Sequence, residues 1–237
     1  MTRREFFQRR IPRYRKDPLL FFKEVTHFEP DPWQREAAVA VSQHRRVAIR
    51  SGQGVGKTAL EANLMWWFIA CFSYPRIVCT APTMQQLDNV LWAEMAKWLD
   101  ASPVLQMMFT WTKTRVYMNG YDRRWFAVPR TATKPESLQG FHEDNMLFVV
   151  DEASGVADPI LDAIGGTLTG ANNRLLYCGN PTKATGGFAE SFQGDGMDWY
   201  CMTVSSRDSP RTSKENIAAL EKKYGKNSNV EIGRAHV

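Results

Sequence analysis

Five short runs of β-favouring, largely apolar residues recur along the chain. They lie at Arg46–Arg50, Arg76–Thr80, Met146–Val150, Leu175–Cys178 and Trp199–Val204. The run at Met146–Val150 has no polar alternation, which is typical of a strand buried on both faces in a central parallel position. We therefore predict that these runs form the strands of one sheet.

Helical patterns fill the intervals between the runs. Trp33–Gln43 has helix-forming composition, Thr58–Phe72 is apolar nearly all round, and Ser213–Tyr224 is polar enough for a surface helix. A further stretch has apolar residues at a four-residue spacing (Leu87, Leu91, Met95, Leu99). Because strands alternate with helices, the chain is predicted to be an α/β protein of three layers with a largely parallel central sheet.

Residues 103–130 interrupt this alternation. They are predicted to be antiparallel β material, with strands at Arg115–Met118 and Arg124–Val128 on either side of the Asn119-Gly120 turn.

The composition is that of a globular protein with one α/β domain. Of the 237 residues, 43% are hydrophobic and 23% charged, and the net charge is +5. The charge is uneven, because residues 1–16 contain many arginines and the single acid Glu5. For this basic N-terminal segment, residues 1–27, two interpretations stay open: a frayed, solvated tail, or a contact to nucleic acid or another acidic partner.

The four cysteines (Cys71, Cys79, Cys178, Cys201) have no metal-ligand spacing, and three of them lie in apolar runs that predict buried, inert thiols. Neither a secretion signal nor a membrane span is recognisable, and an intracellular protein is predicted.

A glycine-rich segment lies between a predicted strand and a predicted helix. Its eight residues, Ser51, Gly52, Gln53, Gly54, Val55, Gly56, Lys57 and Thr58, carry the parts of a phosphate-binding P-loop. Glycines allow backbone N–H groups to turn toward phosphate oxygens, the lysine meets the β- and γ-phosphates, and the hydroxyl of Thr58 binds Mg²⁺. Ser51 stands where the first glycine of the usual pattern is expected. We call this segment the phosphate cradle and predict that it binds ATP.

The strand at Met146–Val150 ends in two adjacent acids. Asp151 is placed to hold Mg²⁺ through water, and Glu152 can polarise the attacking water as the general base. An acid pair that closes a strand is often only the start of a solvated loop. Together with the cradle, however, the pair predicts a P-loop NTPase of the ASCE type, which has a catalytic glutamate.

Two further loops have functional candidates with plain alternatives. Gly179 and Asn180 follow a predicted strand, where a polar side chain can sense the γ-phosphate and couple hydrolysis to the domain; the alternative is a tight Asn-Pro turn without function. Upstream, Gln34 is a candidate to read the adenine edge, with Trp33 packed nearby. The alternative is an exposed polar residue at the start of a helix.

With these residues in hand, the chain resembles the ATPase domain of tailed-bacteriophage terminase large subunits, the motors that pump DNA into capsids. The resemblance spans about residues 28–230. It includes the cradle and six further motifs, at Pro32–Gln34, Cys79–Thr83, Ser137–His142, Val149–Ala153, Leu176–Thr182 and Ser205–Pro210.

The resemblance implies ATP hydrolysis by Glu152, Mg²⁺ held through Thr58 and Asp151, adenine contact at Gln34, and coupling to DNA movement through Gly179 and Asn180. It also implies the partners: double-stranded DNA in the channel of a homo-oligomeric ring, a portal protein, and a small terminase subunit. Such a motor works in the cytoplasm of an infected bacterial host.

Two features depart from the family. Many members have a basic residue in the cradle where this chain has Gln53, so the arginine finger is expected to be Arg50 or to come from a neighbouring subunit. The family's C-terminal nuclease domain has no counterpart before Val237. We expect an ATPase domain at residues 28–204 and the start of a linker at 205–230. Residues 231–237 can be back-translated to the start of a sequencing adapter and are interpreted as read-through.

Two other functions stay open. A helicase-like translocase shares motifs such as Thr80–Thr83, and a nucleotide-dependent switch or loader would hydrolyse ATP without moving DNA. Arg123, Arg124 and Arg130 are DNA-contact candidates by charge and loop position only, against the alternative of a solvated basic face.

Overall fold

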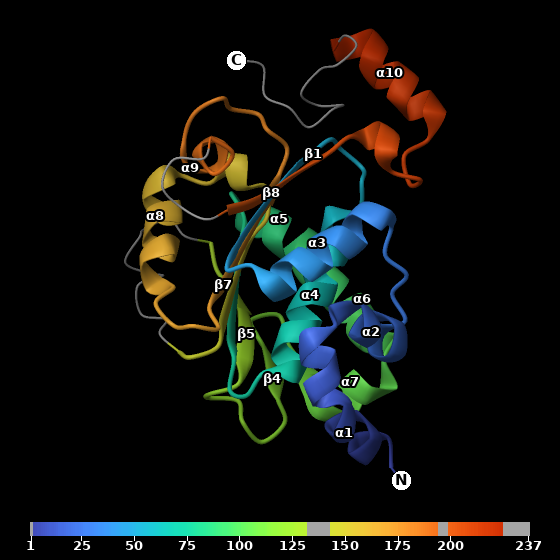
Figure 1. The fold of residues 1–237 in the computed structure, drawn as a ribbon, viewed down its shortest axis with the longest axis vertical. Coiled ribbons are helices and arrows are strands. Elements are labelled where there is room, and N and C mark those ends of the chain that lie inside the picture. The colour runs from blue at the N-terminus through green and yellow to red at the C-terminus, as the bar shows by residue number, and fades with distance from the viewer. Residues whose placement is uncertain (1, 132–142, 194–198, 225–237) are drawn as a thin grey trace.

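The computed structural model describes residues 2–131, 143–193 and 199–224. Its centre is an eight-stranded mixed sheet with helices on both faces (Figure 1). The strands follow one another across the sheet in this order: β3 (Phe109–Trp111), β4 (Val116–Met118), β5 (Phe126–Pro129), β2 (Arg76–Thr80), β6 (Met146–Val150), β7 (Arg174–Gly179), β1 (Arg46–Ser51) and β8 (Trp199–Val204). All pairings from β5 to β8 are parallel, and only β3–β4 and β4–β5 are antiparallel among the described strands. The predicted strands and the largely parallel sheet are therefore confirmed.

The position of β7 sets the geometry of the site. It lies between β1, which leads into the cradle, and β6, which ends at Asp151. All five residues of β6 are buried, as the unbroken apolar run predicted. Because parallel strands end at the same edge, the loops after β1, β6 and β7 meet there.

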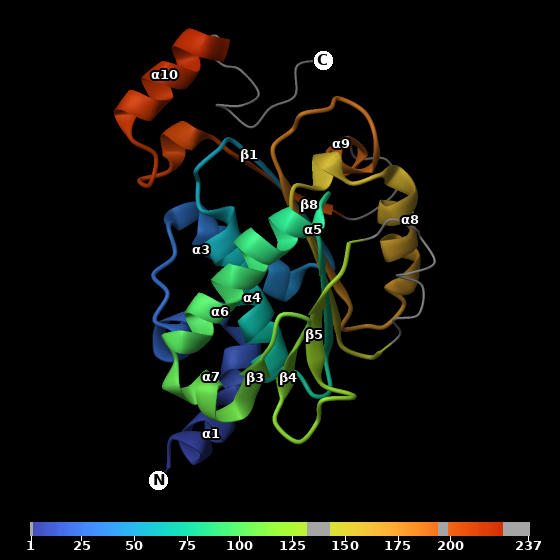
Figure 2. The ribbon, with the colours of Figure 1, turned by 180° about the vertical axis from the view of Figure 1, so that it is seen from behind.

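Helix α4 (Lys57–Cys71) is the centre of one face of the sheet. It is apolar nearly all round because it packs against the sheet on one side and against α1 and α6 on the other. Its two largest side chains are fully buried, and their indole N–H groups donate to backbone carbonyls: Trp66 to Met95 O at 3.0 Å and Trp67 to Tyr14 O at 2.7 Å. Helices α3 (Pro32–Gln43) and α6 (Ala93–Asp100) flank it (Figure 2).

The opposite face is covered by α8 (Asp158–Thr167) and the short α9 (Gly187–Glu190) (Figure 1). The sheet residues that face them, such as Ala48, Phe148 and Tyr177, form a second apolar cluster with Ile160 and Ile164 of α8. The three-layer arrangement is thereby complete.

Residues 2–27 of the basic N-terminal segment are folded, so the interpretation as a frayed tail is wrong. Helix α1 (Arg3–Lys16) begins with a capping box between Thr2 and Glu5 and docks on α4 through buried Phe7 and Tyr14. It continues into α2 (Pro18–Phe21) and a π-helical turn, η1 (Phe22–Thr26). Its exposed basic side chains include Arg4, Arg9 and Arg13. A contact from these to an acidic partner stays a prediction.

The interpretation of residues 103–130 as β material is wrong at its start. Ser102 caps a helix there, α7 (Pro103–Met108), by accepting from the Leu105 amide, and Pro103 fits the first helical position. The remaining part forms β3, β4 and β5 around the predicted Asn119-Gly120 turn. The stretch with four-residue spacing is helical, as a short α5 (Met84–Gln86), a π-helical η2 (Leu87–Trp92) and α6.

After β8 the chain crosses the cradle edge of the sheet. A 3₁₀ turn, η5 (Ser206–Asp208), leads to α10 (Lys214–Tyr224), which projects from the body at the top of Figure 1. Of the four cysteines, the three in apolar runs are buried, as predicted, and Cys201 is exposed. Within the described ranges, no helix has the length and apolar character that crossing a membrane requires.

Candidate active site

The cradle joins β1 to α4 as a tight turn with two glycines in the left-handed region. Gly54 has φ +73° and Gly56 has φ +91°, a conformation that other residues adopt only with strain. Gly56 is also the N-cap of α4, and no side chain of the described residues caps the helix there. The first backbone N–H groups of α4 are thus left without a partner from a capping side chain.

Side chains from outside the cradle hold its carbonyl groups. Gln34 Nε2 donates to Gly56 O at 2.9 Å, and Ser206 Oγ donates to Gln53 O at 2.9 Å. Thr212 Oγ1 lies 3.5 Å from Gly54 O. We call these three side chains the outer brace.

The outer brace determines where the cradle amides point. In a planar trans peptide, a carbonyl and the N–H of the next residue point in opposite directions. Carbonyls held on the outside at positions 53, 54 and 56 therefore turn the N–H groups of Gly54, Val55 and Lys57 inward. Inward amides are what a phosphate needs, so the brace preorganises the cradle.

Lys57 connects the cradle to the two neighbouring strand ends. Its Nζ donates to Asn180 Oδ1 at 2.9 Å and to Ser51 Oγ at 3.2 Å, and lies 3.8 Å from Glu152 Oε1. Four of the residues singled out from the sequence thus meet around one ammonium group. The loops that carry them follow three adjacent strands, as expected from the order β6–β7–β1.

The acid pair is asymmetric in its exposure. Asp151 is 5% exposed, and burial together with the neighbouring Glu152 carboxylate raises its pKa to about 6, against the lowering effect of Lys57. Glu152 is more open, with its side chain 34% exposed, and its backbone is left-handed at φ +48°. Its amide donates to Asp151 Oδ1 at 2.9 Å. Glu152 is therefore the acid that faces solvent, where a water can reach it.

Gly179 allows the loop after β7 to approach the acid pair closely. A β-carbon added there would lie 2.9 Å from the Ala153 nitrogen and 3.3 Å from the Glu152 carbonyl carbon. Neither backbone atom can move away without disturbing the left-handed turn at Glu152. Position 179 thus requires glycine because there is no space for a β-carbon, and not because of a positive φ.

We expect Gly179→Ala to lower ATP turnover roughly 100-fold, because an ångström-scale displacement of a reacting group has a cost of this order. ATP binding, followed by titration with a fluorescent ATP analogue, should persist because the cradle is untouched. Gly165→Ala is the matched control, since nothing in the described residues lies within 4 Å of a β-carbon at Gly165. Wild-type turnover in Gly179→Ala would show that the contact does not constrain Glu152.

A third acid, which sequence reasoning missed, lies below the pair. Glu61 on α4 is fully buried, and its carboxyl oxygens have no nitrogen or oxygen hydrogen-bond partner in the described residues. Burial and the nearby Asp151 raise its pKa well above the usual value, and Lys57 opposes this. The sequence signal for Glu61 was a single acidic residue in a helix that is apolar nearly all round.

The donor set fits a magnesium ion. Mg²⁺ prefers oxygen ligands, and the Thr58 hydroxyl at the start of α4 and the Asp151 carboxylate after β6 would supply them. Burial, and after it the charge of a neighbouring carboxylate, raises the pKa values of Glu61 and Asp151, and a bound divalent cation would offset this repulsion.

Gln34 is buried, and both ends of its amide contact backbone. Its Oε1 accepts from the Asp31 amide at 2.7 Å while its Nε2 donates to Gly56 O. Asp31 in turn binds Arg211, whose Nε lies 2.7 Å from Asp31 Oδ2. The structure thus gives Gln34 a bracing contact, and an adenine contact through its remaining N–H stays a prediction. Trp33 is largely buried beside it.

The other candidates lie apart from this cluster. Arg50 points to the face of the sheet that carries α9, where its guanidinium lies 4.5 Å from the centre of the Phe192 ring and its Nε donates to Thr203 Oγ1. Its role as an arginine finger stays a prediction. The exposed Arg123, Arg124 and Arg130 likewise remain DNA-contact candidates only. The motif at residues 137–142 lies outside the described residues.

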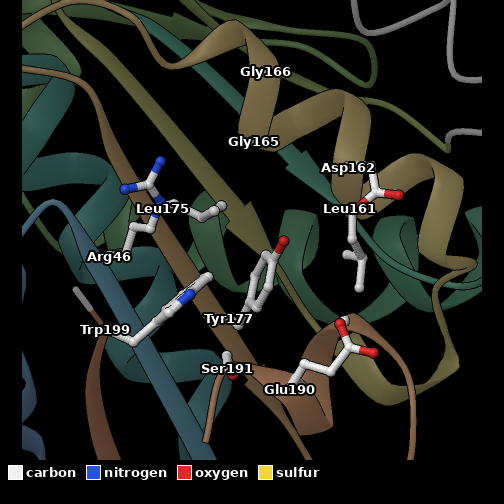
Figure 3. Close-up of a pocket in the computed structure, with 11 residues that line it drawn as sticks. Arg46, Leu161, Asp162, Gly165, Gly166, Leu175, Tyr177, Glu190, Ser191 and Trp199 are labelled. Carbon is white, nitrogen blue, oxygen red and sulfur yellow. The ribbon is translucent and has the colours of Figure 1, made fainter. Parts of the chain in front are cut away.

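A cavity of about 350 Å³ lies on the α8 face, away from the cradle (Figure 3). Tyr177 and Trp199, with ring centres 4.8 Å apart, form one wall, and Asp162 and Glu190 lie across from Arg46. Arg46 opens β1 whereas Ser51 ends it, a separation of roughly 16 Å at the usual rise per strand residue. This cavity is not part of the cradle cluster.

Comparison with known proteins relates the cluster to one family. The family described as "Phage terminase large subunit gpA, ATPase domain" matches residues 24–192. A probable terminase large subunit of Enterobacteria phage P7 is 29% identical over an alignment of 213 residues; the match covers 83% of this chain and 43% of that protein. The chain thus spans less than half the length of this relative.

Solved structures of similar fold include two large terminases. That of bacteriophage HK97 superposes with a TM-score of 0.73 at 17% identity, covering 93% of this chain and 55% of the HK97 chain. The large terminase of a thermophilic bacteriophage, in complex with ATP-gamma-S, superposes with a TM-score of 0.56 at 12% identity, covering 89% and 49% of the two chains. These likenesses confirm the P-loop fold.

Proposed function

The chain belongs to the family of phage terminase large subunit gpA ATPase domains, and from this premise we propose that it is the ATP-hydrolysing motor domain of a DNA-packaging terminase. The observation that carries the proposal is the position of Lys57. Its Nζ contacts Asn180 and Ser51 and lies 3.8 Å from Glu152. The phosphate-binding Lys57, the proposed base Glu152 and the proposed sensor Asn180 therefore lie around one point, which is where the γ-phosphate would bind.

In the proposed reaction the cradle amides and Lys57 bind the β- and γ-phosphates of ATP. Thr58 and Asp151 would hold Mg²⁺, which neutralises phosphate charge when bound. Glu152 orients a water in line with the γ-phosphate and accepts its proton. The complex of the thermophilic bacteriophage terminase with ATP-gamma-S supports the choice of nucleotide.

Asn180 is proposed to report the state of the γ-phosphate. Its amide oxygen now accepts from Lys57, and a bound phosphate would compete for the same ammonium group. Loss of that hydrogen bond would release Asn180, and with it the loop after β7. Gly179 and Asn180 would thus couple hydrolysis to movement.

The arginine finger is proposed to come from a neighbouring subunit or from Arg50. Gln53 is neutral and cannot stabilise the developing charge, and Arg50 lies on the opposite face of the sheet from α4. An arginine from a neighbouring subunit would require an oligomer, and we propose a homo-oligomeric ring that sits on a portal protein. DNA would pass through its channel, and a small terminase subunit would be a further partner. The ring would act in the cytoplasm of an infected bacterial host.

The decisive assay is packaging of double-stranded DNA by the intact large subunit, with its matched portal-bearing procapsids and small subunit. We expect ATP-dependent protection of the DNA from nuclease, and loss of protection with Lys57→Ala. ATP turnover without any DNA protection would instead support a nucleotide-dependent switch. ATP-driven strand separation of a duplex would support a helicase-like translocase.

A further inference from the structure

Ser154 lies two residues after Glu152, in the 3₁₀ turn η4 (Ala153–Gly155), and is 7% exposed. Its hydroxyl donates to the backbone carbonyl of Asn180 at 2.6 Å and accepts from Thr182 Oγ1 at 2.9 Å. The hydrogen of Ser154 is therefore directed at Asn180, because Thr182 supplies the hydrogen of the second bond. Two loops, after β6 and after β7, are joined through this one hydroxyl.

Asn180 carries these contacts toward the cradle. Its carbonyl accepts from Ser154 while its side-chain Oδ1 accepts from Lys57 at 2.9 Å. The next residue, Pro181, favours extended backbone conformations for Asn180, which limits rotation of its carbonyl. Asn180 thus contacts Lys57 through its side chain and Ser154 through its backbone.

The turn at Glu152 needs such an anchor. A left-handed backbone is strained for a residue with a β-carbon, and Glu152 has φ +48° and ψ +46°. Gly179 contacts this turn from one side. Two residues after Glu152, Ser154 forms a hydrogen bond to the Asn180 carbonyl. The two contacts together fix Glu152 relative to the loop after β7.

We propose that Ser154 is a positioning residue for hydrolysis, with Thr182 orienting its hydroxyl. Ser154 and Thr182 together hold Glu152 at a fixed distance from Asn180, so that the base and the side-chain amide of Asn180 move together. The inference rests on the proposed function in one respect, the role of Glu152 as the base. A purely structural hydroxyl, which only satisfies the Asn180 carbonyl, would affect stability and not the chemical step.

The test is Ser154→Ala in the intact protein, with kcat, ATP affinity and melting temperature measured together. We expect kcat at saturating ATP to fall roughly 10- to 100-fold, the cost of a small misplacement of the base. ATP affinity and melting temperature should stay near the wild-type values. Ser154→Thr should restore most of kcat, because it keeps a hydroxyl and Ser154 borders a cavity of about 350 Å³ that has room for a methyl group.

Thr182→Val is the milder second variant, since it keeps the shape and removes only the orienting donor. Its kcat should lie between those of the wild type and Ser154→Ala. Thr185→Val is the matched control, because the exposed Thr185 borders the same cavity and makes no hydrogen bond to Ser154 among the described residues. It should leave kcat unchanged.

Glu152→Gln in the same series separates the two ideas. If it loses turnover while Ser154→Ala keeps wild-type kcat, or loses kcat only in parallel with melting temperature, the positioning role is wrong and the proposed function stands. If the wild type hydrolyses no ATP, or Glu152→Gln hydrolyses it normally, the proposed function itself fails.

Discussion

Glu152→Gln should keep ATP bound and lower kcat by roughly 10²- to 10⁴-fold, the range that a general base contributes. Glutamine has nearly the same shape and can still touch a water, but its amide oxygen cannot take up the proton. The left-handed turn, Gly179 and Ser154 would hold the new side chain in the same place. The loss therefore belongs to the chemical step.

A second result should accompany it. The Glu152 carboxylate raises the pKa of Asp151, so its removal should lower that pKa and favour the ionised form that binds Mg²⁺. Nucleotide binding in Glu152→Gln should consequently be at least as tight as in the wild type. Equilibrium binding of radiolabelled ATP and single-turnover phosphate release measure the two effects. The control is Glu190→Gln on α9, which lies outside the cluster, and full turnover in Glu152→Gln would remove Glu152 from the base role.

Lys57→Ala should abolish measurable ATP turnover and weaken ATP binding by about 10- to 100-fold, since a hydrogen bond to a charged group contributes about 1.5–3 kcal/mol. The lysine is the only cradle side chain that contacts Asn180 and Glu152 in the described structure. Its removal thus takes away the phosphate contact and the link between the three strand ends. The fold should persist, because Lys57 opens α4 and makes no contribution to its apolar face.

Lys97→Ala provides the control for this charge change. Lys97 pairs with Glu94 on the surface of α6, and such exposed pairs contribute little to stability. It should bind and hydrolyse ATP like the wild type. Normal ATP affinity in Lys57→Ala, measured by calorimetric titration, would contradict the placement of the phosphates on the cradle.

Much of the fold was predictable because its signals are contiguous. Met146–Val150 is wholly apolar and forms a central strand, and the cradle carries glycines, lysine and hydroxyl in one segment. The failure at residues 103–108 shows the limit of this approach. A short apolar run does not distinguish strand from helix, and here the Ser102 cap and Pro103 favoured the helix.

The site was predictable only as far as its motifs were continuous. Gly179 was noted from its turn, but its close contact with Ala153 depends on how β7 packs beside β6. Ser154 and Thr182 meet across two loops, and nothing in either local sequence indicates the pairing. The bracing contact of Gln34 arises for the same reason, because its partner Gly56 is brought to it by the fold.

The outer brace also has a mechanical consequence. Two of its three side chains, Ser206 and Thr212, belong to the segment that runs from β8 to α10, and α10 projects from the body (Figure 1). Tension along this segment would be delivered to the carbonyls of Gln53 and Gly54 before it reached the core of the sheet. Force applied to α10 would thus reach the phosphate cradle through Ser206 and Thr212, and a change in the cradle would reach α10 by the same contacts.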